Sequence, residues 1–100
     1  MPDAFHAIAE GNRRVLLEAL REGERPVGAL VEASGLSYSL VSQHLSVLLD
    51  AGVVERRPDG RRRIYGIQAG PLRAVYDWTA TYEAFWQERV ERLRRQLDAR

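Results

Sequence analysis

The sequence predicts a mainly α-helical domain with a small β-hairpin, and two adjacent stretches of the chain are the basis of this prediction. Val41, Leu45 and Leu48 recur at three- and four-residue steps, which is typical of a helix with one buried side. Two short β-type runs follow, joined by Pro58-Asp59-Gly60, whose residue types suit a tight turn. A helix followed by a basic hairpin is the layout of a winged helix-turn-helix fold.

The exposed side of the first stretch, residues 37–52, is polar but almost uncharged. Ser37 can cap the first turn of a helix and Gly52 can end the last turn. The outward positions hold Ser39, Ser42, Gln43, Ser46 and Asp50. Because small neutral donors and acceptors suit the base edges of a major groove, this face predicts a recognition helix. An ordinary core helix with a serine-rich outer side is the alternative.

Three shorter helices are predicted before this stretch. Asp3 can cap a first helix that runs to about residue 10, and Asn12 can cap a second that runs to about residue 22. Pro26 suits the opening of a third helix that runs to about residue 33. The turn at residues 34–36 then completes a helix-turn-helix over about residues 26–51.

The predicted wing covers about residues 53–67. Val53 or Val54 on one arm, with Ile64 and Ile67 on the other, would hold the hairpin against the helices. The tip carries Arg56, Arg57, Arg61, Arg62 and Arg63. This local cluster indicates a nucleic-acid partner better than the net charge of +1 does. Arg57, Arg61 and Arg63 are expected to point outward from the hairpin. The alternative is a solvated basic turn that binds no partner.

One long dimerisation helix is predicted over about residues 71–98, because no helix breaker follows Gly70-Pro71. At 1.5 Å per residue it would be roughly 40 Å long. An apolar stripe recurs along it at Leu72, Val75 or Tyr76, Thr79, Tyr82, Trp86, Val90, Leu93 and Leu97. A single domain of 100 residues cannot cover such a length, so the second half of the helix should pack on another chain.

Three segments, R-R-V-L-L-E-A-L, V-S-Q-H-L-S-V-L-L-D-A-G-V-V and D-G-R-R-R-I-Y, occur in this order. Together they resemble the ArsR family of small bacterial winged-helix transcriptional repressors, from about residue 5 to the end of the chain. The resemblance implies a homodimer that binds DNA, usually as a repressor at its own operator. It also implies pairing through the first and last helices, so that Phe5 and Ile8 join Tyr76, Tyr82, Trp86, Val90, Leu93 and Leu97 at the interface.

On this reading, two recognition helices enter successive major grooves of a pseudo-palindromic operator, about 34 Å apart. Ser39, Ser42 and Gln43 are the predicted base contacts, with Gln43 suited to adenine. Ser37, which opens the helix, is also predicted to lie at the DNA-binding face, and Tyr38 would reach the DNA backbone or a thymine methyl group. Phosphate contacts are predicted for Arg57, Arg61, Arg62 and Arg63. His44 lies by helix geometry at the edge of the buried side, where packing is as reasonable as DNA contact, and only the resemblance places it near DNA.

Other chemistry finds little support in the sequence. The chain has no cysteine, and His6 and His44 lie on different predicted elements without metal-ligand spacing. The Cys pair and the histidines of the metal sensors that the family is known for are missing, so no metal or other cofactor is predicted. Ser42, His44 and Asp50 do not face one another, so no enzyme is predicted. With no apolar span or leader, we expect a cytoplasmic protein.

Three further possibilities follow from the same features. The fold could act as a protein–protein interaction module, with the wing as a mere basic surface and no sequence-specific DNA binding. A metal-responsive repressor is a weaker alternative. The aromatic residues of the predicted dimerisation helix could also bind a small apolar inducer between helices. The fluorescence of Trp78 and Trp86 would then report binding.

Overall fold

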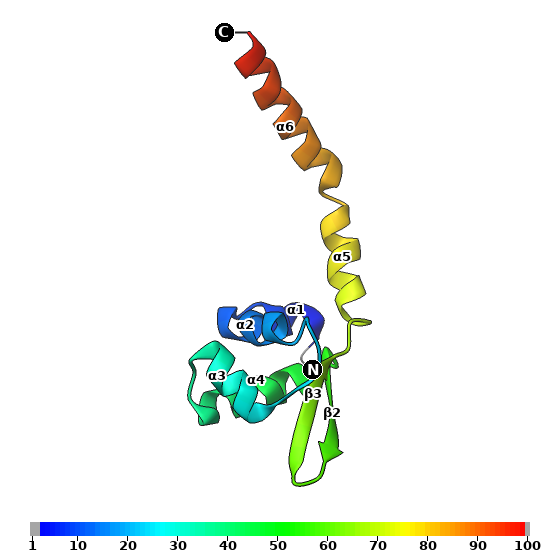
Figure 1. Cartoon of the computed structure of the whole chain (residues 1–100). Helices are drawn as coiled ribbons and strands as arrows, with labels where there is room; N and C mark the ends of the chain where they lie inside the picture. Colours follow the sequence, from blue (N-terminus) through cyan, green and yellow to red (C-terminus); the bar gives the residue numbers. More distant parts are fainter. Residues whose placement is uncertain (1–2, 100) are drawn as a thin grey trace.

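The computed structural model describes residues 3–99, and the predicted winged helix-turn-helix arrangement is present in it (Figure 1). In chain order the elements are α1 (Ala4–Ile8), α2 (Gly11–Ala19), β1 (Arg25–Pro26), α3 (Val27–Ser34), α4 (Tyr38–Asp50), β2 (Val54–Asp59), β3 (Arg62–Ile67), α5 (Leu72–Ala80) and α6 (Glu83–Asp98). Helices α3 and α4 form the helix-turn-helix, and β2 and β3 form the wing. None of the helices within residues 3–99 is long and apolar enough to span a bilayer.

The N-termini of α1, α2 and α4 are set by side-chain caps, two of which the sequence predicted. The Asp3 carboxylate accepts a hydrogen bond from the His6 amide at 2.9 Å, and Ser37 Oγ accepts one from the Leu40 amide at 3.1 Å. The prediction that Asn12 caps the second helix is wrong. Glu10 takes this place, because its backbone is extended and its carboxylate reaches the Arg13 amide at 3.1 Å. Helix α2 therefore begins at Gly11, and it ends at Ala19 rather than near residue 22.

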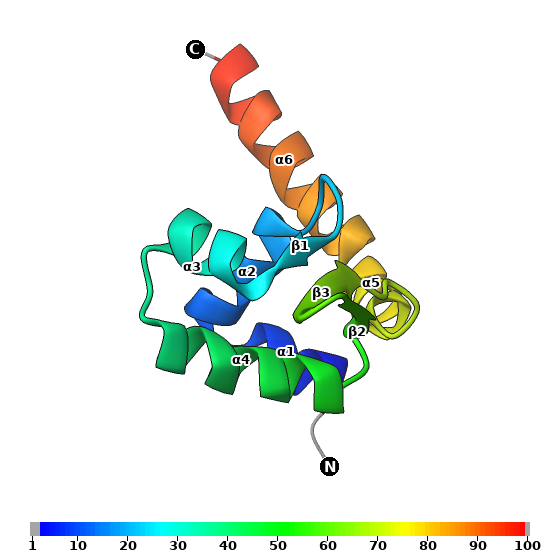
Figure 2. The ribbon, with the colours of Figure 1, turned by 60° about the horizontal axis from the view of Figure 1, so that its bottom comes forward.

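The core lies between α2, α3, α4 and the base of the wing (Figure 2). Val41, Leu45 and Leu48 of α4 are buried, as their spacing predicted. They pack in one cluster with the following residues from the surrounding elements: Leu16, Leu17, Leu20, Leu30, Val53, Val54 and Tyr65. One face of α4 is thus fixed by burial, which leaves its polar face at the surface.

The sheet has three strands in the order β1-β3-β2, all antiparallel, and β1 was not predicted. Residues opposite one another share a face, so the pairs Val54↔Ile67 and Arg56↔Tyr65 place these side chains together. Ile64 lies on the other face, opposite Arg57. Ile64 is buried and Ile67 packs, partly buried, against the core, so both are covered as expected. They do this from opposite faces of the hairpin, because residues three apart on a strand point in opposite directions. Tyr65 takes the core position.

The single helix predicted over residues 71–98 is divided in the structure. Helix α5 ends at Ala80 and α6 begins at Glu83, with Tyr82 at φ −97° and ψ 0° between them. The hydroxyls of Thr79 and Thr81 donate hydrogen bonds to the carbonyls of Tyr76 and Trp78, at 3.0 and 2.7 Å. Such bonds compete with the helical ladder and bend helices. The two helices project from the body of the molecule (Figure 1). With them, the whole molecule measures 63 × 27 × 20 Å.

Candidate nucleic-acid interface

A groove with a volume of about 530 Å³ lies between α4 and the wing. Three elements line it, and their side chains are mostly hydroxyls and guanidinium groups. From α3 and the residue before it come Pro26, Val27 and Gly28, from α4 come Tyr38, Ser42, Ser46 and Leu49, and from the wing come Arg56, Arg61, Arg62, Arg63 and Tyr65. The polar face of the helix and the basic hairpin thus border one surface.

The predicted residues of α4 lie at its exposed side. Tyr38 is 64% exposed, and Ser37, Ser39, Ser42 and Gln43 are exposed as well. This follows from the burial of Val41 and Leu45, since residues on the opposite side of the same helix must face outward. Ser46 also lines the groove.

Four of the five wing arginines line the groove, and one of them was missing from the predicted phosphate contacts. Arg56 shares a face with Tyr65, and Arg63, opposite Pro58, lies on the same face. Strand alternation counted from the buried Val54 would have identified Arg56, because residues two apart share a face. Within residues 3–99, Arg56, Arg61 and Arg63 have no ion-pair partner, while Arg62 lies 3.6 Å from an oxygen of Asp59. These guanidinium groups are therefore available for anions.

Arg57, a predicted phosphate contact, is placed elsewhere. It lies on the opposite face of the hairpin and does not line the groove. Its Nε donates a hydrogen bond to a carboxylate oxygen of Glu24 at 2.7 Å, across 33 residues of sequence. Glu24 belongs to the loop before β1, an element that the sequence did not reveal.

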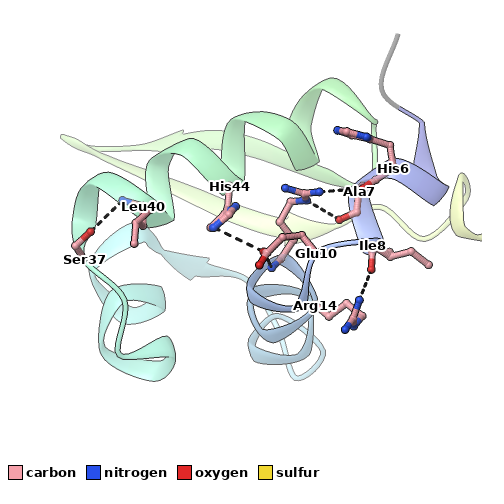
Figure 3. A network of polar contacts seen from close by, with 9 residues as sticks. His6, Ala7, Ile8, Glu10, Arg14, Ser37, Leu40 and His44 are labelled. Carbon is pink, nitrogen blue, oxygen red and sulfur yellow. Dashed lines mark hydrogen bonds and ion pairs between the residues drawn. The ribbon is translucent and has the colours of Figure 1, made fainter.

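His44 faces the body of the protein rather than the groove (Figure 3). Its side chain is 15% exposed, and its Nε2 lies 3.7 Å from a carboxylate oxygen of Glu10, the cap of α2. The contact becomes an ion pair when the imidazole is protonated. Of the two placements that the sequence left open, the structure shows the packed one.

The residues predicted at a dimer interface form an open apolar surface. The exposed residues along α5, α6 and the two-residue link between them are Tyr76, Tyr82, Trp86, Val90, Leu93 and Leu97. Phe5 of α1 is 39% exposed and stacks edge-on against Trp78, with ring centroids 6.0 Å apart. Ile8 is partly buried and packs against the core. Nothing within residues 3–99 covers α6, none of whose residues is buried.

The described residues offer no obvious metal centre. Within residues 3–99 no group of three or more His, Cys, Asp or Glu side chains converges on one point. The carboxylate of Asp77 accepts a hydrogen bond from Arg73 Nε at 2.9 Å.

A helix-turn-helix whose exposed polar face shares a groove with a basic hairpin defines a winged helix-turn-helix protein of the nucleic-acid-binding class. The sequence model of the protein family described as "Bacterial regulatory protein, arsR family" matches residues 10–56 of the chain. The HTH-type transcriptional regulator Rv2034 of Mycobacterium tuberculosis is 40% identical over 86 residues, which are 85% of this chain and 78% of that protein. The transcriptional repressor SdpR of Bacillus subtilis is 27% identical over 82% of this chain and 91% of its own length.

A solved structure shows the same likeness. The homodimeric winged helix-turn-helix DNA-binding domain (fragment 1–100) of Mb0332 from Mycobacterium bovis is 35% identical, with a TM-score of 0.61, over 85% of this chain and 76% of that one. Two further relatives are matched over only 50% and 27% of their own length. The chain belongs to the ArsR family of bacterial regulatory proteins. The resemblance noted in three sequence segments is thereby confirmed, and the chain is a transcriptional regulator.

Proposed function

We propose that the protein is a homodimeric repressor that binds a pseudo-palindromic DNA operator through α4 and the wing. The observation that carries the proposal is the shared groove, in which Ser42 of α4 faces the same space as Arg56 and Arg63 of the wing. Neutral polar groups can distinguish bases, whereas guanidinium groups bind phosphates of any sequence. One surface thus combines the two kinds of contact that a specific DNA complex needs.

Within each half-site the roles divide by element. Ser39, Ser42 and Gln43 are exposed on α4 and contact base edges, while Tyr38, at the start of the helix, contacts the backbone or a thymine methyl group. Arg56, Arg61, Arg62 and Arg63 contact phosphates beside them. Arg57 and His44 are not in this set, because Arg57 is paired with Glu24 and His44 packs beside Glu10, both away from the groove.

Dimerisation supplies the second half-site. Helices α5 and α6, whose apolar residues are exposed, extend from the body on the side opposite the hairpin tip (Figure 1). A partner chain can therefore bind there without covering the groove. The Mb0332 domain, which is homodimeric, supports this arrangement, and a repressor among the relatives supports the sign of regulation.

The test is fluorescence anisotropy of the purified protein with duplex DNA from upstream of its own gene and with a shuffled duplex. The titrations are repeated over a salt series with EDTA present. We expect a preference of about a thousandfold or more for the upstream sequence, unaffected by EDTA. Equal, steeply salt-dependent binding to both duplexes would mean a basic surface without base recognition. Absence of binding would favour a protein–protein module.

A further inference from the structure

The ion pair between Glu24 and Arg57 sets one wing arginine apart from the other four. Arg57 Nε and Glu24 Oε2 are 2.7 Å apart, a typical length for a charge-assisted hydrogen bond, and the two side chains are 59% and 48% exposed. The other pair on the wing, Arg62 with Asp59, is longer, at 3.6 Å. Arg57 is therefore the wing cation whose charge is most completely matched within the chain.

The local backbone favours this pair. Glu24 precedes β1, and its side chain must cross β3 to reach Arg57 on β2, since the strand order is β1-β3-β2. It crosses at Gly66, where a Cβ atom would lie only 3.0 Å from Glu24 Cγ. Together with Glu55 and Ile64, these residues border a small cavity of about 170 Å³ on the face of the hairpin away from α4. A residue without a side chain on β3 thus leaves the path open for Glu24.

The pair is not needed to hold the wing in place. Backbone pairing of β1 with β3 joins the hairpin to the body, and Val53, Val54 and Tyr65 are buried at its base. Ion pairs as exposed as this one contribute little to stability. Its main consequence is electrostatic, because the Glu24 carboxylate takes the Nε–H donor of Arg57 and offsets the positive charge that would attract a phosphate.

We propose that Glu24 is an autoinhibitory residue, which keeps Arg57 away from DNA phosphates and so lowers the affinity of the wing for any duplex. The inference rests on the proposed DNA-binding function and adds that the affinity for DNA is lower than the five wing arginines alone would allow. Each phosphate that a protein neutralises on duplex DNA adds about 0.9 to the magnitude of the slope of log K against log salt. With Glu24 present, Arg57 contributes nothing to that slope.

The experiment compares wild type, Glu24→Gln, Arg57→Gln and the double variant by anisotropy with both duplexes over a salt series. Arg57→Gln should leave the slope unchanged. Glu24→Gln should steepen it by about 0.9, so that affinity falls about 3.5-fold more between 50 and 200 mM salt. The double variant should return to the wild-type slope. This non-additive pattern distinguishes release of Arg57 from a mere change in net charge.

Two further variants sharpen the result. Glu55→Gln removes an acid from the same face of the hairpin, where Glu55 has no ion-pair partner within residues 3–99, and should change the slope less than Glu24→Gln. Gly66→Ala keeps every charge but displaces Glu24, and should act like Glu24→Gln if its thermal unfolding shows that it folds.

A lower slope for Arg57→Gln alone would show that Arg57 already binds a phosphate, and would overturn the inference. An unchanged slope for Glu24→Gln would overturn it equally. Both outcomes leave the preference for the upstream duplex intact, and with it the proposed function. Failure of wild type and all variants to bind either duplex would contradict the proposed function and the inference together.

Discussion

Ser37 is the residue on which the first turn of α4 depends. Its hydroxyl accepts a hydrogen bond from the Leu40 amide, one of the donors that has no partner within the helix (Figure 3). We expect Ser37→Ala to lower the free energy of unfolding by about 1 kcal/mol. Urea denaturation followed by circular dichroism measures this. Ser39→Ala, an exposed serine in the same turn, is the control, and equal losses for both variants would contradict the capping role.

Gln43 is the predicted base contact with the most specific chemistry. A side-chain amide can donate to and accept from one adenine at the same time, which the serines cannot do. Gln43→Ala should weaken operator binding by about 1 to 3 kcal/mol and relax the preference at one base pair in each half-site. Competition anisotropy with duplexes substituted at single base pairs measures this. Gln87→Ala on α6 is the control, and an unchanged base preference would contradict the assignment of α4.

For single residues, the sequence predicted contacts between near neighbours in the chain but not contacts between residues far apart in it. The caps Asp3 and Ser37 follow from residue type and position, and both were predicted. The partner of Arg57 lies 33 residues away, on a loop whose position depends on β1. His44 sits at the boundary between two helix faces, and the carboxylate that it approaches belongs to Glu10, the cap of α2, which is far away in the sequence.

At the scale of elements, the missing predictions have physical causes. Strand β1 has two residues, too few for any periodicity, and exists only because Tyr65 and Ile64 of β3 pair with it. The break between α5 and α6 contains neither Gly nor Pro, the usual signals of a helix end. By contrast, α4 and the wing combine strong periodicity with clear turn residues, and both were predicted close to their observed bounds.

The break itself can be tested by removing its cause. Thr79 and Thr81 donate to carbonyls three residues earlier, and threonine has a lower helix propensity than alanine. The double variant Thr79→Ala/Thr81→Ala should extend a continuous helix through Tyr82. Carbon chemical shifts from NMR at residues 79–83 measure this, with those of α4 as the internal reference. Shifts at Tyr82 that stay outside the helical range would assign the break to another cause.

At the scale of the whole molecule, the projecting helices dominate the shape. The radius of gyration is 18.0 Å, whereas a compact domain of 100 residues has one of about 13 Å. The excess comes from α5 and α6, whose residues are exposed or only partly buried. The sequence predicted this from length alone, since no small core can cover so long an apolar stripe. The stripe explains why a second copy of the chain is the expected partner.

Leu93 tests this expectation, because it lies in the middle of the exposed stripe of α6 and contributes nothing to the core. It is 56% exposed, so a charge there costs the folded monomer little, while in a dimer interface the same charge would be buried without a partner. We expect wild type to sediment at twice the chain mass of 11.4 kDa and Leu93→Glu at the chain mass, with similar circular dichroism.

The matched control is Ala84→Glu, which introduces the same charge on the opposite side of α6, two and a half turns away. It should leave the mass unchanged. Because a monomer binds only one half-site, Leu93→Glu should also weaken binding to the upstream duplex about a hundredfold or more, as expected when two linked contacts become one. A Leu93→Glu protein that still sediments at twice the chain mass would show that the stripe of α6 is not the interface. The interface would then be assigned to α1 and α5, where Phe5 stacks on Trp78.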